Sequence, residues 1–383
     1  LCTCRPKDEP LEKALSRLRT KAAPPAPKMR RKRGEAPAEP PAQPAAEPLP
    51  VALFSDAAAS SPIQASVLNS QAWPAGRCLQ IGDEFFDIVY NPPTVDKISL
   101  ARRALVDHPL LALPEVMFAD EGITTYRWLR SPPGGCGEWA DTGCTDAVYT
   151  PCEADVGCSL RVECTARRAG GSSCEAEVVG QPLCAETPAV EPAPRLPCSV
   201  LRAPVPMAAA AAPAFRISSY NILADQYAGS TFAQQVLFGY CPAEFLDPEY
   251  RKQLVLQELL RYNSDIMCLQ EVDQKAFKEY LLPHLSQAGF HGRYTNKMGK
   301  VKEGSATFWR TSRFVEAGHH DVLLRDVFKQ PLDPTHSQWQ AMLDASPELC
   351  TALQKVTTVA QATVLQPAPG VAGEPICVVN THL

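Results

Sequence analysis

The chain has 383 residues, which is enough for two domains and a sizeable core. Its formal net charge of −5 excludes an overall basic character, so any nucleic-acid site must be a local basic groove. No run of 18 or more apolar residues occurs, and the sequence therefore predicts no membrane span.

Residues 1–50 contain a short helical pattern, PLEKALSRLRTKA, followed by the basic cluster KMRRKR at 28–33 and a run of Pro, Ala and Glu. This composition buries little apolar surface and predicts a disordered tail over 1–50. The basic cluster could bind RNA or act as a nuclear signal. The simpler interpretation, which we adopt, is a solvated charge run in a tether.

Residues 51–185 change to short strand-like pieces separated by Gly and Pro, including an aromatic strand at 124–130 and two strands within 147–166. Regularly spaced strands without helices predict a β-sandwich domain here. Residues 186–213, rich in Pro and Ala, predict a linker. Of the 15 cysteines, none forms a CxxC pair, which argues against zinc; free thiols or disulfides remain open for those between 136 and 184.

Three strands in the last part of the chain each end in a polar side chain. The stretch 215–225 places Asn221 at a strand end, the apolar run 265–269 leads to Glu271, and 375–383 ends in Asn380 and His382. A carboxylate at the end of a buried strand must be paired or bind a metal. Amphipathic helices predicted at 250–265 and 275–289 alternate with these strands, which indicates an α/β arrangement with a site at the strand ends.

The segment 292–314 combines Lys297, Lys300 and Lys302 with a strand that carries Trp309. These residues could line a nucleic-acid groove by charge and stacking. Alternatively, Trp309 lies in the core and the lysines form a solvated loop. The stretch 321–356 has a helical texture, and 362–367 and 375–383 are expected to form a hairpin.

SYNILAD, DIMCLQEVD, EGSATFWRTSRF and VVNTHL follow one another in an order that resembles the endonuclease/exonuclease/phosphatase superfamily, within it the deadenylase-like branch. The resemblance implies an α/β (α+β) two-sheet sandwich flanked by helices over 214–383. It also implies hydrolysis of 2′,5′-oligoadenylate and 3′ poly(A) RNA with Mg²⁺ or Mn²⁺. The expected location is the mitochondrial matrix, or alternatively the cytoplasm, and we expect neither a membrane nor an obligate protein partner.

The resemblance also implies roles for single residues. Glu271 would be the metal ligand, Asn221 would supply an amide to the metal or phosphate, and His382 would contact the scissile phosphate. Asn380, Lys297, Lys300, Lys302 and Trp309 are candidates for substrate binding.

The superfamily's later motifs, a GDFN-type strand and an SDH-type motif, do not occur before Leu383. We therefore expect the chain to hold the N-terminal half of the catalytic domain, truncated at both ends, and to be inactive by itself. The alternatives are a phosphatase for a nucleotide or inositol phosphate, and a non-catalytic module that binds RNA or protein.

Overall fold

The computed structural model describes residues 6–22, 49–170, 177–193 and 214–382, with short gaps at 57, 60, 75–76, 89–90, 121, 136, 300–301 and 330. The chain divides into two compact units. The first consists of 1–94, 117–123 and 166–180, and the second of 95–116, 124–165 and 181–383. Within the described ranges, no helix is long and apolar enough to cross a membrane.

The first unit is built around a helix that packs on a small antiparallel sheet. Helix α1 (Leu11–Ala22) buries Leu11, Ala14, Leu15 and Leu18 against the sheet. The other elements are β1 (Val51–Phe54), α2 (Asn69–Ala72), β2 (Cys78–Ile81), β3 (Glu84–Asp87), β11 (Arg167–Arg168) and β12 (Val178–Val179). The expected disorder of 1–50 is therefore wrong for residues 6–22, because the leucines repeat at helical spacing and find an apolar partner. The KMRRKR cluster lies outside the described residues.

Short strands make up the early part of the second unit. They are β4 (Thr94–Ser99), β5 (Leu110–Leu111), β6 (Leu113–Met117), β7 (Thr125–Arg130), β8 (Ala140–Asp141), β9 (Val148–Tyr149), β10 (Ser159–Thr165) and β13 (Leu183–Ala189), with a 3₁₀ turn, η1 (Glu153–Asp155). The largest sheet has the order β13-β10-β7-β8, and Trp128 on β7 is fully buried and stacks on Tyr149. The strands are distributed over several small sheets and both units, so a single sandwich domain over 51–185 stays a prediction.

Strand β13 also corrects the expected linker. The chain remains paired in strand through Ala189, and Val190 and Glu191 form further bridges, so the order extends beyond residue 186. Residues 194–213 lie outside the described ranges. The ten cysteines for which the structure gives a state, among them Cys144, Cys158, Cys164 and Cys184, are all free thiols.

The later part of the second unit contains a four-stranded sheet of order β14-β15-β17-β16 and a three-stranded sheet of order β18-β19-β20. Their strands are β14 (Ile217–Asn221), β15 (Ile266–Asp273), β16 (Phe290–Asn296), β17 (Glu303–Arg310), β18 (Phe314–Leu323), β19 (Val359–Pro367) and β20 (Ile376–Asn380). β14 and β15 are parallel, and the other pairs are antiparallel. An α/β architecture is therefore confirmed, whereas its being half of a larger domain stays a prediction.

Strand β15 is buried on both faces, as its continuous apolar sequence requires. Met267 and Leu269 pack toward the helices, while Ile266 and Cys268 pack with Trp309 and with side chains of the three-stranded sheet. The chain therefore has helices on one face of the four-stranded sheet and a second sheet on the other.

Helices cover the first face where amphipathic patterns predicted them. They are α4 (Pro248–Arg261), α5 (Gln274–Ala276) and α6 (Leu282–Gln287), with a π turn, η4 (Phe277–Leu281). The segment between β14 and α4, for which no helix was predicted, forms α3 (Asp225–Ala228), a π-helical turn η2 (Ala233–Leu237) and a 3₁₀ turn η3 (Ala243–Leu246). The expected helix over 275–289 is interrupted by the π turn η4. Pro283 follows this turn, and a proline inside a helix removes an N–H donor and crowds the preceding turn.

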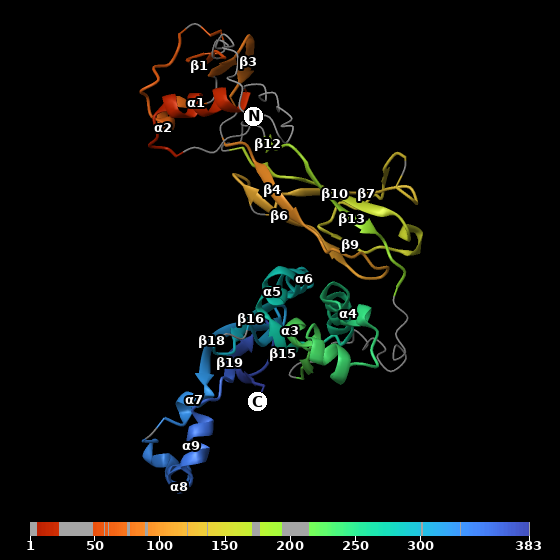
Figure 1. Ribbon diagram of the computed structural model, residues 1–383, viewed down its shortest axis with the longest axis vertical. Coiled ribbons are helices and arrows are strands. Elements are labelled where there is room, and N and C mark those ends of the chain that lie inside the picture. Colours follow the sequence, from red (N-terminus) through yellow and green to blue (C-terminus); the bar gives the residue numbers. More distant parts are fainter. Residues whose placement is uncertain are drawn as a thin grey trace, which may run out of the picture. The chain divides into compact units, whose positions relative to one another are not determined.

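The helical stretch predicted at 321–356 forms α7 (Leu324–Val327), η5 (Pro334–His336), α8 (Ser337–Ala345) and α9 (Pro347–Leu353). These helices lie together at one end of β18 (Figure 1). β19 and β20 pair as the expected hairpin, which carries the last strand to the edge where β14 and β15 end.

Gly304 on β17 allows a close approach of β16. A Cβ atom at this position would lie 2.0 Å from the Thr295 carbonyl oxygen, which is a backbone atom that has no room to move aside. We expect Gly304→Ala to lower the free energy of unfolding by about 1–3 kcal/mol, as measured by urea denaturation. Gly318→Ala is the matched control, because nothing lies within 4 Å of its added Cβ. Equal effects of the two substitutions would contradict this account.

His284 on α6 gives the stability a pH dependence. Burial, opposed by a hydrogen bond from its Nδ1 to the Tyr280 carbonyl, lowers its pKa from 6.5 to about 4. As the pH falls from 6.5 toward 4, His284 binds a proton in the unfolded chain but not in the folded chain. The free energy of unfolding therefore decreases across this range. We expect His284→Gln to flatten the decline in unfolding free energy between these pH values, and substitution of the exposed His336 to leave it unchanged.

Candidate active site

Glu271 lies at an irregularity in β15. The pairing of β15 with β17 shifts register between Leu269 and Val272, and Glu271 has a φ of +54°, which is unusual for a residue other than glycine. A bulge of this kind re-aims a side chain that would otherwise follow the alternation of the strand. The strand itself continues to Asp273, beyond the apolar run that ended at Leu269 in the sequence analysis.

Two N–H donors hold the Glu271 carboxylate. Asn221 Nδ2 donates to Oε1 at 2.7 Å, and the backbone N–H of Ala224 donates to Oε2 at 3.2 Å. The Asn221 Oδ1 accepts a hydrogen bond from the Leu223 N–H at 2.9 Å, so the orientation of its amide is set from both ends. Arg251 on α4 holds the loop by donating to the carbonyls of Ile222 at 2.6 Å and Leu223 at 2.7 Å.

His382 completes a group of three side chains from three strand ends. Its Nε2 lies 3.5 Å from Asn221 Nδ2 and 3.8 Å from Glu271 Oε1. The preceding residue, Thr381, donates its hydroxyl to the Val359 carbonyl and thereby fixes the end of β20. Parallel strands end at a common edge, and this is the edge where the sequence placed a site.

Three further carboxylates, none of them predicted from the sequence as a site residue, surround this group. The Asp225 N–H donates to Asp273 at 2.6 Å, and Glu303 on β17 lies opposite Asp273 across the strand pair. Burial, together with the neighbouring negative charges, raises the pKa of both Asp225 and Asp273. Glu303 is fully buried, and its sequence signal was an acidic residue placed directly before the apolar run of β17.

Two residues expected to bind substrate lie in the interior instead. Asn380 is 2% exposed, and its amide is bonded to Gln270 Nε2 and to the carbonyls of Leu269 and Ala306. Trp309 is 2% exposed and belongs to the core between the sheets, as the second of its two interpretations predicts.

The lysines of the 292–314 segment differ from one another. Lys302 is exposed, Lys300 lies outside the described residues, and Lys297 is mostly buried beside Glu303 and His382. Of the two lysines that the structure describes, Lys302 is the one that fits a solvated substrate contact.

The donor set fits a cation that needs few protein ligands. The described side chains form no cluster of three or more His, Cys, Asp or Glu arranged for a metal. Mg²⁺, however, is commonly held by one or two carboxylates together with water and phosphate oxygens. Glu271, whose side chain is 13% exposed, supplies such a carboxylate, and Asn221 supplies an amide beside it.

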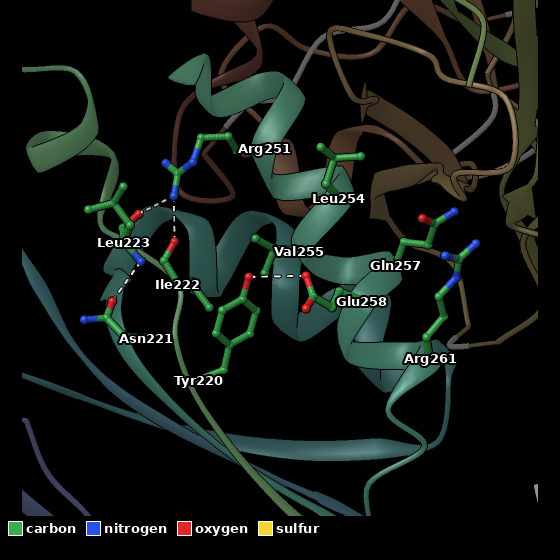
Figure 2. Close-up of a pocket in the computed structure, with 10 residues that line it drawn as sticks. All are labelled: Tyr220, Asn221, Ile222, Leu223, Arg251, Leu254, Val255, Gln257, Glu258 and Arg261. Carbon is green, nitrogen blue, oxygen red and sulfur yellow. Dashed lines mark hydrogen bonds between the residues drawn. The ribbon is translucent and has the colours of Figure 1, made fainter. Parts of the chain in front are cut away.

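A cavity of about 310 Å³ lies behind the end of β14, between this strand and α4 (Figure 2). Tyr220, Asn221 and residues of α4 line it, and the Tyr220 hydroxyl bonds to Glu258 across it. Neither Glu271 nor His382 lines this cavity. The cavity therefore includes Asn221 but not the other two side chains of the strand-end group.

Comparison with known proteins finds a family model that is similar to this region. Residues 218–335 match the Endonuclease/Exonuclease/phosphatase family. This match agrees with the resemblance found from the motifs.

Particular relatives extend the match. The 2′,5′-phosphodiesterase 12 of Mus musculus is 33% identical over 408 aligned residues, covering 99% of this chain and 65% of the relative. The Homo sapiens protein of the same name is 32% identical, covering 99% of this chain and 64% of its own length. The CCR4-Not complex 3′-5′-exoribonuclease subunit Ccr4 of Schizosaccharomyces pombe is 42% identical, covering 26% of this chain and 15% of its own. The chain thus spans slightly less than two thirds of the first of these relatives.

The position of Asn380 predicts a structural role that can be measured. We expect Asn380→Ala to lower the free energy of unfolding by about 3 kcal/mol, because each buried group left without a partner costs about 1–3 kcal/mol. Chemical denaturation measures this, with Gln287→Ala as the control because that amide is exposed at the end of α6. A loss of less than about 0.5 kcal/mol would refute the structural role.

Proposed function

We propose that this chain is part of a metal-dependent phosphodiesterase and 3′-exoribonuclease that hydrolyses 2′,5′-oligoadenylate and 3′ poly(A) ends of RNA. The observation that carries the proposal is the convergence of Asn221, Glu271 and His382, all within 4 Å of one another, at the edge where three strands end. Phosphodiester hydrolysis needs a deprotonated water, neutralised charge on the phosphoryl oxygens and a stabilised leaving oxygen. A carboxylate and an amide that bind a cation, together with an imidazole that donates to a phosphoryl oxygen, would serve the second of these needs.

Each residue has a distinct role in this proposal. Glu271 would hold Mg²⁺ or Mn²⁺ with help from Asn221, and the bound ion would supply charge neutralisation at the phosphate. His382 donates a hydrogen bond from Nε2 to a phosphoryl oxygen and stabilises the charge that develops there. Lys302, exposed beside the edge, contacts the substrate backbone.

The substrate class rests on similarity. Relatives across 99% of the chain are named 2′,5′-phosphodiesterases, and a relative of the later region is named a 3′-5′-exoribonuclease subunit. We propose the mitochondrial matrix as the location on the earlier resemblance alone. Release of AMP from 2′,5′-triadenylate or 3′,5′-oligo(A) would support this function, whereas release of only inorganic phosphate would favour the phosphatase alternative.

Substitution of Glu271 tests the metal role. In the full-length protein we expect Glu271→Gln to reduce kcat for hydrolysis of 2′,5′-triadenylate by on the order of 10²–10⁴-fold, because the neutral amide is a poor ligand for a hard cation. In the chain described here, we expect the same change to weaken Mn²⁺ binding, followed by electron paramagnetic resonance of the free ion.

Glu279→Gln is the matched control, because Glu279 has the same charge and its side chain is 67% exposed on η4. The control should retain both activity and Mn²⁺ binding. Near-normal turnover of the Glu271→Gln protein would remove Glu271 from the proposed site.

A further inference from the structure

We propose that Lys297 is a positioning residue for His382, held in place by the buried carboxylate of Glu303, and not a substrate-binding lysine. The consequence for catalysis rests on the proposed function, whereas the effect on the imidazole can be measured without it. The observation behind the proposal is a continuous line of polar atoms from Glu303 through Lys297 to His382.

Lys297 is anchored at its inner side. Its Nζ lies 2.8 Å from Glu303 Oε1, and the Glu303 side chain is fully buried while that of Lys297 is 18% exposed. The Tyr227 hydroxyl donates to the same Oε1 at 3.2 Å, and Oε2 has no hydrogen-bond partner among the described residues. A buried carboxylate with so few donors strongly requires its cation, so Lys297 is not free to swing out toward solvent.

The backbone reinforces this placement. The Lys297 N–H donates to the Glu303 carbonyl at 3.0 Å, which closes the ladder between β16 and β17. The close approach of the two strands at Gly304 brings the ammonium group of one against the carboxylate of the other. Lys302, in contrast, is exposed on the same hairpin.

The contact with His382 determines which ring nitrogen carries the hydrogen. Lys297 Nζ lies 3.5 Å from His382 Nδ1, and an ammonium group donates hydrogen bonds but accepts none. Nδ1 must therefore present its lone pair, and the hydrogen of the neutral ring resides on Nε2. The Glu271 carboxylate oxygen, 3.8 Å from Nε2, favours the same tautomer.

The orientation of Asn221 alone would favour the other arrangement. Its Nδ2 faces His382 Nε2 at 3.5 Å, and since Nδ2 can only donate, it would suit a lone pair on Nε2. Lys297 resolves this competition because its charged donor acts at Nδ1. It thereby leaves an Nε2–H group directed at the edge where the phosphate is proposed to bind.

Nitrogen NMR of histidine side chains tests this directly. The chain is labelled with ¹⁵N-histidine and studied at about pH 8.5, two units above the ordinary histidine pKa. The His382 signals are assigned by their loss in His382→Gln. We expect a protonated Nε2 and an unprotonated Nδ1 in the unsubstituted protein, and a mixture of tautomers in Lys297→Met. Lys297→Arg retains a cationic donor and should preserve the original pattern.

An unchanged His382 pattern in folded Lys297→Met overturns the proposal. If removal of the lysine prevents folding, the double variant Lys297→Met with Glu303→Gln removes both charges. The nitrogen NMR signals of His382 in this variant are then compared with those of the unsubstituted protein by the same criterion. Lys329→Met is the control for loss of a surface charge, because Lys329 is 70% exposed and pairs with Asp326 on α7.

Kinetics of the full-length protein separate positioning from substrate binding. We expect Lys297→Met to lower kcat by roughly 10- to 100-fold with little change in KM, since His382 acts in the transition state. A raised KM with unchanged kcat would show that Lys297 binds substrate and would overturn the proposal. Absence of hydrolysis by the unsubstituted protein would refute the proposed function, and the NMR result would then decide the role of Lys297.

Discussion

The arrangement of the site depends on one held carboxylate. Glu271 leaves the alternation of β15 through a bulge at positive φ, and its two oxygens are fixed by the Asn221 amide and the Ala224 N–H. A residue other than glycine in this conformation costs of order 1–3 kcal/mol and persists only where the surroundings impose it. Arg251 contributes to this by holding the carbonyls of the loop that follows Asn221. The strained backbone at Glu271 and the hydrogen bonds to its side chain thus both fix the position of the Glu271 carboxylate.

Behind this edge, the two sheets are joined by polar side chains as well as apolar ones. Gln361 on β19 is fully buried, accepts the Thr307 hydroxyl at 2.6 Å and donates to the Thr295 hydroxyl at 2.9 Å. Asn380 joins β20 to the carbonyls of β15 and β17. Apolar packing alone tolerates small slips between sheets, whereas each of these bonds is satisfied in one register only. The network therefore fixes the strand ends that carry Glu271 and His382.

Much of this could be predicted from the sequence, because apolar runs ended by polar residues identify strands and their exposed ends. The strands that deliver Asn221, Glu271 and His382 were found in this way, and so were the amphipathic helices. Pattern reasoning could not distinguish Asn380, bonded in the interior, from a substrate ligand, since both readings place an amide at a strand end. Trp309 was ambiguous for a similar reason. The helical pattern of α1 was assigned to a disordered tail because the apolar surface on which it packs lies far away in sequence.

The electrostatics of the edge explain why it suits a cation. Four carboxylates, on Asp225, Glu271, Asp273 and Glu303, face the cationic side chains of Arg251 and Lys297, which are already engaged with Asp225 and Glu303. Burial and the neighbouring negative charges raise the pKa of Asp225 and Asp273, which reflects the electrostatic cost of bringing these carboxylates together. A divalent cation at Glu271 would offset this repulsion. Because Lys297 is committed to Glu303, it does not compete with that cation for Glu271, and its remaining donor capacity is directed at His382.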